Sequence, residues 1–278
     1  MNRNMWDHAP NNEAVQKAVA QQDYAHRPNA LMACLMFSWR TILKIRYVPE
    51  QLFDVTLFPI MFTLMFTYLF GGAIAGSTGD YLHYLLPGIL VQTVIFTTVY
   101  TGVTLNTDIT KGVFDRFRSL PIWSPSVIVG ALLGDMLRYL LASSTIIILG
   151  LLLGFRPGGG VTGVLSAVLL LLVFAFSISW VFTALGLVMR TPNAVMGLGM
   201  TVLFPLTFAS NIFVDPGTMP VWLQKFVHVN PITILATAER GLMHGNGSLL
   251  EVGMALMISA LFVLLFAPLT MALYRVKS

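Results

Sequence analysis

Six long apolar runs constrain this chain more than any other feature of its sequence. Each run is close to the ~20 residues that an α-helix needs to cross the hydrocarbon core of a bilayer. In chain order, we predict spanning helices at residues 52–70, 85–106, 127–154, 163–189, 194–213 and 249–273. The sequence therefore predicts an all-α integral membrane protein with six transmembrane helices, which places both termini on one side of the membrane.

The composition agrees with a chain that uses lipid as part of its solvent. Only 10% of the 278 residues are charged and 56% are hydrophobic, whereas soluble domains carry roughly 25% charged residues. A single cysteine, Cys34, excludes an intramolecular disulfide. The net charge of +4 is distributed beside the apolar runs and not in one cluster, so we expect no nucleic-acid partner.

The segment before the first span divides into two parts. Residues 1–29 are polar, of mixed charge and without an apolar run, so we expect a flexible cytosolic tail and no signal peptide. A single transmembrane domain is expected over residues 30–278. Its first helix, over residues 30–47, has apolar positions at steps of four, four and three: Leu31, Leu35, Trp39 and Ile42. Because Arg40, Lys44 and Arg46 project elsewhere, we predict an amphipathic helix lying flat in the headgroup layer.

Lysine and arginine residues favour one orientation of the six spans. One side of the membrane receives Arg40, Lys44, Arg46, Lys111, Arg116, Arg118, Arg190, Arg275 and Lys277. The opposite side receives Arg156, Lys225 and Arg240. Cytoplasmic loops are enriched in these residues, so both termini are predicted to be cytoplasmic.

The connection between the second and third spans reads DITKGVFDRFRSLPIWSP over residues 108–125. Basic residues alternate there with apolar ones, which predicts a short amphipathic helix from Lys111 to Pro121 on the cytosolic side. Pro121 ends that helix because proline cannot continue it. One face can fill an apolar cleft while the other meets an acidic partner.

The connection between the fifth and sixth spans, residues 214–247, is only partly polar. It contains a Trp-Leu-Phe group and an apolar half-helix that we expect Pro231 to interrupt and Gly241 and Gly245 to close. Such segments are too short to span, so we expect them to lie at the outer leaflet or to dip into it.

The sequence shows no pattern for chemistry on this chain. The phosphate-binding pattern G-x-x-x-x-G-K-[ST] is missing, as is the G-x-S-x-G elbow of hydrolases. The five histidines show no metal-ligand spacing. We therefore expect no catalytic residue, no metal site and no cofactor on this chain.

Ionisable residues in or beside the apolar segments are the default functional candidates of a membrane protein. Asp135 and Arg138 are three apart on one helix, so they form either a structural ion pair or part of a gate. Glu239 and Arg240 are adjacent and point in different directions, which suits an interfacial anchor or an outer gate. The spans lack the series of buried carboxylates that a proton-coupled carrier needs.

Aromatic residues and methionines are frequent in the spans and suit either helix packing or an apolar, lipid-like cargo. The aromatic set is Phe58, Phe62, Phe66, Phe96, Phe174, Phe176, Trp180, Phe182, Phe204 and Phe208.

Three passages carry a family resemblance. They are D-x-x-x-G-x-x-D-R-F-R-S-L-P from Asp108 to Pro121, F-V-D-P-G-T-M-P-x-W-L-Q from Phe213 to Gln224, and N-P-I-T at Asn230 to Thr233 with Arg240, Gly241 and Leu242 following. With these passages, the chain resembles the permease subunit of type-2 ABC exporters, and among them the daunorubicin-resistance group of drug and lipid exporters.

The resemblance implies a prokaryotic cell-membrane permease that moves an apolar or amphipathic cargo outward. It also implies a pair of re-entrant half-helices in the outer connection between the fifth and sixth spans. The permease would pair with itself or with a related permease and with two copies of a separate ATPase subunit, which would hold the ATP and Mg²⁺. The coupling residues in contact with the ATPase would be Lys111, Gly112, Phe114, Asp115, Arg116, Phe117, Arg118, Ser119, Leu120 and Pro121, together with Arg40, Lys44 and Arg46 of the interfacial helix. The alternatives are a type-2 exporter of polysaccharide and a secondary carrier that works without an ATPase.

Overall fold

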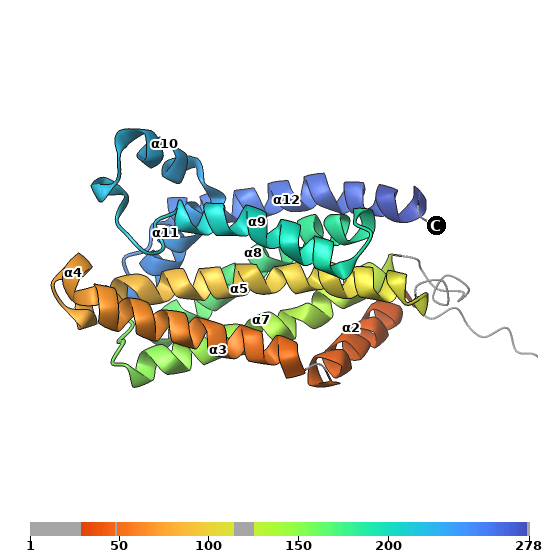
Figure 1. Ribbon diagram of the computed structural model, residues 1–278, viewed down its shortest axis with the longest axis horizontal. Coiled ribbons are helices and arrows are strands. Elements are labelled where there is room, and N and C mark those ends of the chain that lie inside the picture. The colour runs from red at the N-terminus through yellow and green to blue at the C-terminus, as the bar shows by residue number, and fades with distance from the viewer. Residues whose placement is uncertain (1–28, 48, 114–124, 277–278) are drawn as a thin grey trace, which may run out of the picture.

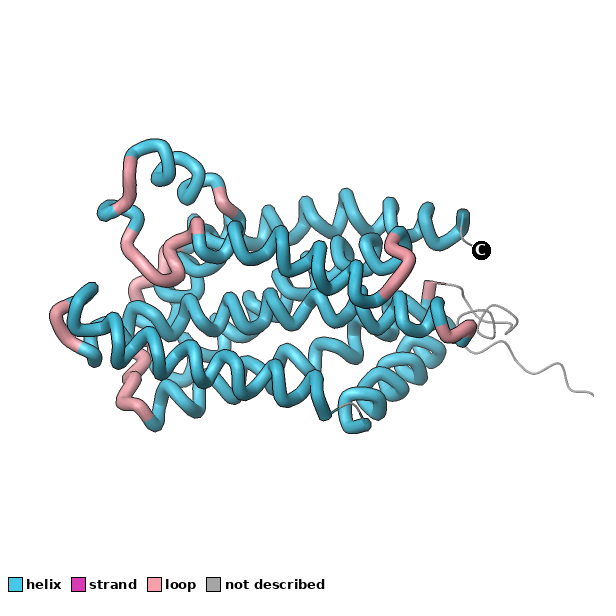
Figure 2. Tube along the Cα trace, viewed as in Figure 1, coloured by secondary structure: helices cyan, strands magenta, loops and turns pink. Residues whose placement is uncertain are grey.

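The structure is a computed structural model that describes residues 29–47, 49–113 and 125–276. These residues form an elongated bundle of helices (Figure 1) and contain no strand (Figure 2). The long helices are α3 (Pro49–Met65), α5 (Thr78–Thr110), α7 (Ser126–Leu152), α8 (Gly160–Val188), α9 (Pro192–Phe208) and α12 (Leu249–Val276). The remaining elements are α2 (Ala30–Tyr47), a π-helical turn (Phe66–Phe70), α4 (Gly71–Ala75), a 3₁₀ turn (Pro216–Thr218), α10 (Val221–Val229) and α11 (Pro231–His244).

The helix α5 runs through the centre of the bundle (Figure 1) and packs against α3, α7, α8, α9 and α11. It is longer than the predicted span of residues 85–106, because it begins at Thr78 and ends at Thr110. Residues 71–84, expected to be a loop, instead form α4 and the first two turns of α5. The reason is local: the Ser77 side chain accepts a hydrogen bond from the Asp80 backbone N–H at 3.0 Å and caps the helix.

Five helical segments of the described residues are long and apolar enough to cross a membrane, one fewer than the six spans predicted. They are Val55–Ala75, Thr78–Thr110, Ser126–Leu152, Gly160–Val188 and Leu249–Val276. The fifth predicted span, residues 194–213, corresponds to α9, which has 17 residues and ends at Phe208. The side chain of Asn230 causes this early end, because its amide donates to the carbonyls of Leu206 and Ala209 at 2.7 and 2.8 Å.

The first helix, α2, packs closely against α7 through two glycines. A Cβ atom on Gly130 would lie 2.5 Å from the Cβ of Phe37, and one on Gly134 would lie 2.6 Å from the Cβ of Thr41. Small residues four apart allow two helix backbones to approach in this way. The opposite face of α2 carries the predicted apolar stripe, which is exposed at Leu31, Leu35 and Trp39.

The two ends of the bundle differ in their contents (Figure 1). The helix α2 and the last turn of α12 lie at the right-hand end, while α4, α10 and α11 lie at the left. Pro231 begins α11 and does not interrupt it, since Asn230 caps the helix, and Gly245 ends it with a positive φ of 78°. Gly241, expected to help close this helix, lies within it. The helix α11 is buried against α5, α8 and α12, whereas α10 exposes Trp222.

Candidate functional site

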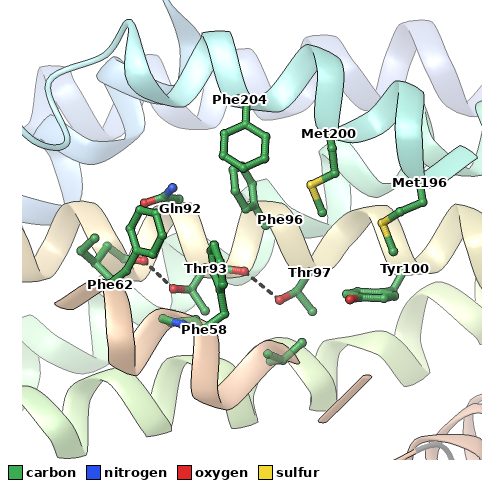
Figure 3. Close-up of a pocket in the computed structure, with 13 residues that line it drawn as sticks. Phe58, Phe62, Gln92, Thr93, Phe96, Thr97, Tyr100, Met196, Met200 and Phe204 are labelled. Carbon is green, nitrogen blue, oxygen red and sulfur yellow. Dashed lines mark hydrogen bonds between the residues drawn. The ribbon is translucent and has the colours of Figure 1, made fainter. Parts of the chain in front are cut away.

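An apolar groove of about 400 Å³ lies between α3, α5 and α9. Helix α5 forms its floor, while α3 and α9 form its two walls (Figure 3). The lining residues recur at helical spacing on each element: Val55, Phe58, Pro59 and Phe62 on α3; Ile89, Gln92, Thr93, Phe96, Thr97 and Tyr100 on α5; and Met196, Met200 and Phe204 on α9. Each helix therefore presents one face to a shared space.

Aromatic rings dominate the walls of the groove. The rings of Phe58 and Phe62 have centroids 4.7 Å apart on α3, and those of Phe96 and Phe204 are 5.2 Å apart across α5 and α9. In Figure 3, Phe204 points from α9 toward α5. Phe58 and Phe204 are 46% and 39% exposed, so the mouth of the groove is accessible from outside the bundle. Pockets of this size and lining accommodate drug-sized apolar molecules.

The polar residues of the groove floor differ in how their side chains are used. Thr93 and Thr97 donate their hydroxyls to the carbonyls of Ile89 and Thr93, each at 2.7 Å, within their own helix (Figure 3). Gln92 is 4% exposed, and its amide nitrogen Nε2 has no hydrogen-bond partner among the described residues. The groove thus contains a buried donor that the fold leaves unpaired.

One end of the groove adjoins a buried polar cluster through Tyr100. The guanidinium carbon of Arg138 lies 5.9 Å from the centre of the Tyr100 ring. Arg138 and Asp135 form the ion pair expected from their spacing, with Nη1 and Oδ1 3.2 Å apart. The contact is an ion pair by distance only, because neither atom has a partner in hydrogen-bond geometry. Both side chains are almost fully buried.

Hydrogen bonds extend this cluster across three helices. The hydroxyl of Thr101 on α5 donates to Oδ2 of Asp135 on α7 at 2.6 Å and lies 2.9 Å from the hydroxyl of Tyr139. Tyr139 in turn lies 2.7 Å from the hydroxyl of Ser179 on α8. We call Thr101, Asp135, Arg138, Tyr139 and Ser179 the core polar cluster. Because polar groups need partners in an apolar medium, it fixes how α5, α7 and α8 pack.

A second group of charges joins α2 to the last turns of α5. Asp108 accepts from Lys44 Nζ at 2.6 Å and lies 3.1 Å from Nη1 of Arg40. Burial lowers the pKa of Lys44, while the hydrogen bond to Asp108 raises it. Two of the basic residues expected to meet an ATPase are therefore paired within the chain, and the Arg46 side chain lies outside the described part.

The predicted coupling helix falls mostly outside the described residues. Lys111 and Gly112 form a turn after α5, with Gly112 at a φ of 66°, so they do not start a helix as expected. Glycine adopts this left-handed conformation without strain, which suits the turn. The side chain of Lys111 is exposed. Residues 114–121 of the coupling set lie outside the described ranges.

Glu239 and Arg240 occupy contrasting environments at the other end of the bundle. Arg240 stacks 4.0 Å above the centre of the Tyr84 ring and donates to the carbonyls of Tyr84 and Asn211 at 3.2 and 3.0 Å. Glu239 is fully buried, and neither carboxyl oxygen has a hydrogen-bond partner among the described residues. Burial raises the pKa of Glu239 well above its ordinary value. This burial contradicts the expectation that Glu239 anchors the half-helix at the membrane interface.

Sequence reasoning missed several residues of this site. Gln92 and Tyr100 were not singled out, because helical spacing alone does not show which face of a buried helix meets a groove. Asp108 is predicted from the sequence only as part of a motif. Its position one turn before Lys111, beside a basic segment, was a signal that could have indicated its ion pairs. The contact between the rings of His83 and His244, with centroids 6.2 Å apart, joins residues far apart in the chain.

Comparison with known proteins identifies the family. The family model described as ABC-2 type transporter matches residues 32–244, from α2 to the end of α11. The chain belongs to the ABC-2 type transporter family. The predicted resemblance to type-2 ABC permeases is confirmed, and membership of this family implies an ATPase partner.

Individual relatives place this ABC-2 permease among proteins associated with drug resistance. It is 55% identical over 252 residues to the daunorubicin resistance ABC transporter permease protein of Streptomyces coeruleorubidus, covering 91% of this chain and 89% of that one. It is 22% identical over 198 residues to a probable doxorubicin resistance ABC transporter permease protein of Mycobacterium tuberculosis, covering 71% of each chain. A further doxorubicin resistance permease of that organism is 25% identical over 185 residues, covering 66% of this chain and 64% of that one.

Proposed function

We propose that this ABC-2 permease exports an apolar or amphipathic drug-like cargo from the cytoplasm of a prokaryote, and that the groove between α3, α5 and α9 is part of the path. The observation that carries the proposal is an aromatic groove of about 400 Å³ in a chain that is 55% identical to a daunorubicin resistance permease. An apolar lining favours such a cargo over a polysaccharide, which needs hydrogen-bonding walls.

The power source in this proposal is a pair of ATPase subunits that hold the ATP and Mg²⁺. They bind the cytosolic segment from Lys111 to Pro121, with Arg116 and Arg118 meeting acidic groups and Phe114, Phe117 and Leu120 filling an apolar cleft. The interfacial helix α2 lies beside this contact, because Arg40 and Lys44 hold Asp108 one turn before Lys111. Movement of the ATPases is thereby transmitted to α5 and α7.

Two copies of this chain, or one copy and a related permease, enclose the cargo path in the cell membrane with both termini cytoplasmic. The exposed apolar stripe of α2 then rests in the inner headgroup layer, and α10 and α11 occupy the outer leaflet. Asp135 with Arg138, and Glu239 with Arg240, are proposed as inner and outer gating positions, because each pair lies at a junction of several helices.

The test uses the full chain purified with its candidate ATPase in lipid discs, with daunorubicin as the probe. ATP turnover is expected to rise when daunorubicin is added, and vesicles containing the complex are expected to transport it. Replacing Phe117 and Arg118 together with alanine should leave the chain folded but remove the link between ATP hydrolysis and transport.

A matched control is Arg190→Ala, which removes one basic residue from the exposed turn between α8 and α9. This variant is expected to couple normally. Transport that persists without nucleotide, or that is unchanged in the Phe117 and Arg118 variant, would contradict the proposal.

A further inference from the structure

The unpaired amide of Gln92 indicates what the groove recognises. Gln92 lies on the α5 floor, one turn after Ile89 and toward the end of the groove opposite Tyr100, and its Nε2 has no hydrogen-bond partner among the described residues (Figure 3). A buried donor without an acceptor is destabilising, so folded proteins pair nearly all of them. An unpaired donor within a binding groove is therefore expected to meet an acceptor on the bound molecule.

The threonines of the groove floor do not compete for that acceptor. The hydroxyls of Thr93 and Thr97 are already bonded within α5. Among the described lining residues, Nε2 of Gln92 is the buried side-chain nitrogen or oxygen without a partner. Gln92 is thus the groove residue whose buried donor the fold leaves available to a bound molecule.

The surrounding rings define the remainder of the ligand. Phe58 and Phe62 lie on the α3 wall, and Phe96 on the floor pairs with Phe204 on the α9 wall. Aromatic side chains contact flat rings favourably in stacked or edge-on arrangements. Met196 and Met200 add flexible, polarizable side chains that adapt to ring systems of different outline.

We propose that Gln92 is a specificity-determining residue whose amide donates a hydrogen bond to a carbonyl oxygen of a flat aromatic cargo held between the α3 and α9 walls. This inference rests on the proposed function and deepens it, because it states the chemistry that the cargo must carry. The three rotatable bonds of the side chain let the amide turn toward a ligand that reaches the floor. An aromatic compound without an acceptor leaves the amide unpaired and binds more weakly.

The experiment measures equilibrium binding to the full chain in lipid discs, with protein-free discs as the blank. The probes are 9-fluorenone and fluorene, which share one flat ring frame and differ at one position, where fluorenone has a carbonyl and fluorene a methylene group. The unmodified chain is expected to bind fluorenone about threefold to tenfold more tightly than fluorene, the range for one hydrogen bond. In Gln92→Met, which keeps the length and removes the donor, the two affinities become equal and that for fluorene is unchanged.

The matched control is Thr93→Val, because the Thr93 hydroxyl is used within its own helix and so the preference for fluorenone should persist. Thermal unfolding of Gln92→Met should be no easier than that of the unmodified chain, since no bond made by Nε2 in the fold is lost.

Several results would overturn the inference. One is equal binding of fluorenone and fluorene by the unmodified chain. Another is a preference for fluorenone that persists in Gln92→Met. A change of oligomeric state in Gln92→Met would show that a second copy of the chain covers the groove. These results can be distinguished from a failure of the proposed function. If daunorubicin does not change the rate of ATP turnover, the export proposal fails. If the preference for fluorenone is nevertheless lost in Gln92→Met, the assignment of Gln92 stands.

Discussion

Two stretches of α5, nine residues apart, differ in what surrounds their buried polar groups. At Thr101, hydrogen bonds and an ion pair join the members of the core polar cluster across α5, α7 and α8, although Oδ1 of Asp135 and Nε and Nη1 of Arg138 have no hydrogen-bond partner among the described residues. At Gln92, the groove leaves an amide nitrogen unpaired. Because unpaired polar atoms in an apolar medium are costly, the first arrangement stabilises the bundle and the second favours binding of a molecule from outside. The difference separates polar residues that hold helices together from one that recognises a ligand.

The strongest test of this comparison removes a charge from the core polar cluster. Arg138→Met leaves the buried carboxylate of Asp135 without its ion-pair partner, and breaking a buried pair in this way costs about 3–5 kcal/mol. We expect a large loss of stability, measured by thermal unfolding in lipid discs. The double variant Arg138→Met with Asp135→Asn removes both charges and should recover much of the loss. Normal stability of the single variant would mean that the cluster does not hold the bundle together.

A second test concerns Glu239, which is buried like Asp135 but has no charged or hydrogen-bonding partner among the described residues. Because burial raises its pKa, the folded chain keeps this proton at pH values where the unfolded chain has lost it. Stability should therefore fall as pH rises above about 4.3, the ordinary glutamate value, by about 1.4 kcal/mol per pH unit until the raised pKa is reached.

Glu239→Gln, which is neutral at every pH, should remove this part of the pH dependence. The measurement is thermal unfolding across a pH series, with Glu251→Gln as the control because Glu251 is more exposed. Identical pH profiles for the unmodified chain and Glu239→Gln would contradict the assignment of a neutral carboxyl.

The smallest effect is expected at the partly exposed charges that join α2 to α5. Asp108→Asn removes the ion pairs with Arg40 and Lys44, and pairs with access to water contribute about 0.2–1 kcal/mol each. The free energy of unfolding should fall by no more than the contribution of these two pairs. The loss should be smaller in high salt, because mobile ions screen the charges. A loss as large as that in Arg138→Met would erase the distinction between buried and exposed pairs. ATP turnover with the ATPase is the informative second measurement.

Much of the helical bundle could be predicted from the sequence because long apolar runs have few alternatives to spanning a membrane. The boundaries were harder to predict because they depend on single capping side chains. Ser77 starts α5 seven residues before the predicted span, and Asn230, 24 residues further along the chain, ends α9 at the carbonyl of Leu206. Such contacts are not encoded in hydrophobic periodicity.

The site was predictable in part. The spacing of Asp135 and Arg138 correctly predicted an ion pair, since residues three apart share a helix face. Phe58, Phe62, Phe96 and Phe204 were among the aromatic residues that suited an apolar cargo, but only the packing of three helices shows that they share one groove. Gln92 could not be selected, because an unpaired amide is recognised only when its surroundings are known.

The contacts of α2 on both sides of the segment of residues 111–125 have a consequence for chimeric permeases. The helix α2 holds α5 through Asp108 before the segment, and it packs against Gly130 and Gly134 of α7 after it. Transplanting residues 111–125 alone into another permease would leave the flanking ends of α5 and α7 packed against a first helix to which the new segment is not matched. Exchanging the preference for an ATPase partner between two relatives should therefore require that α2 and residues 111–125 be transplanted together.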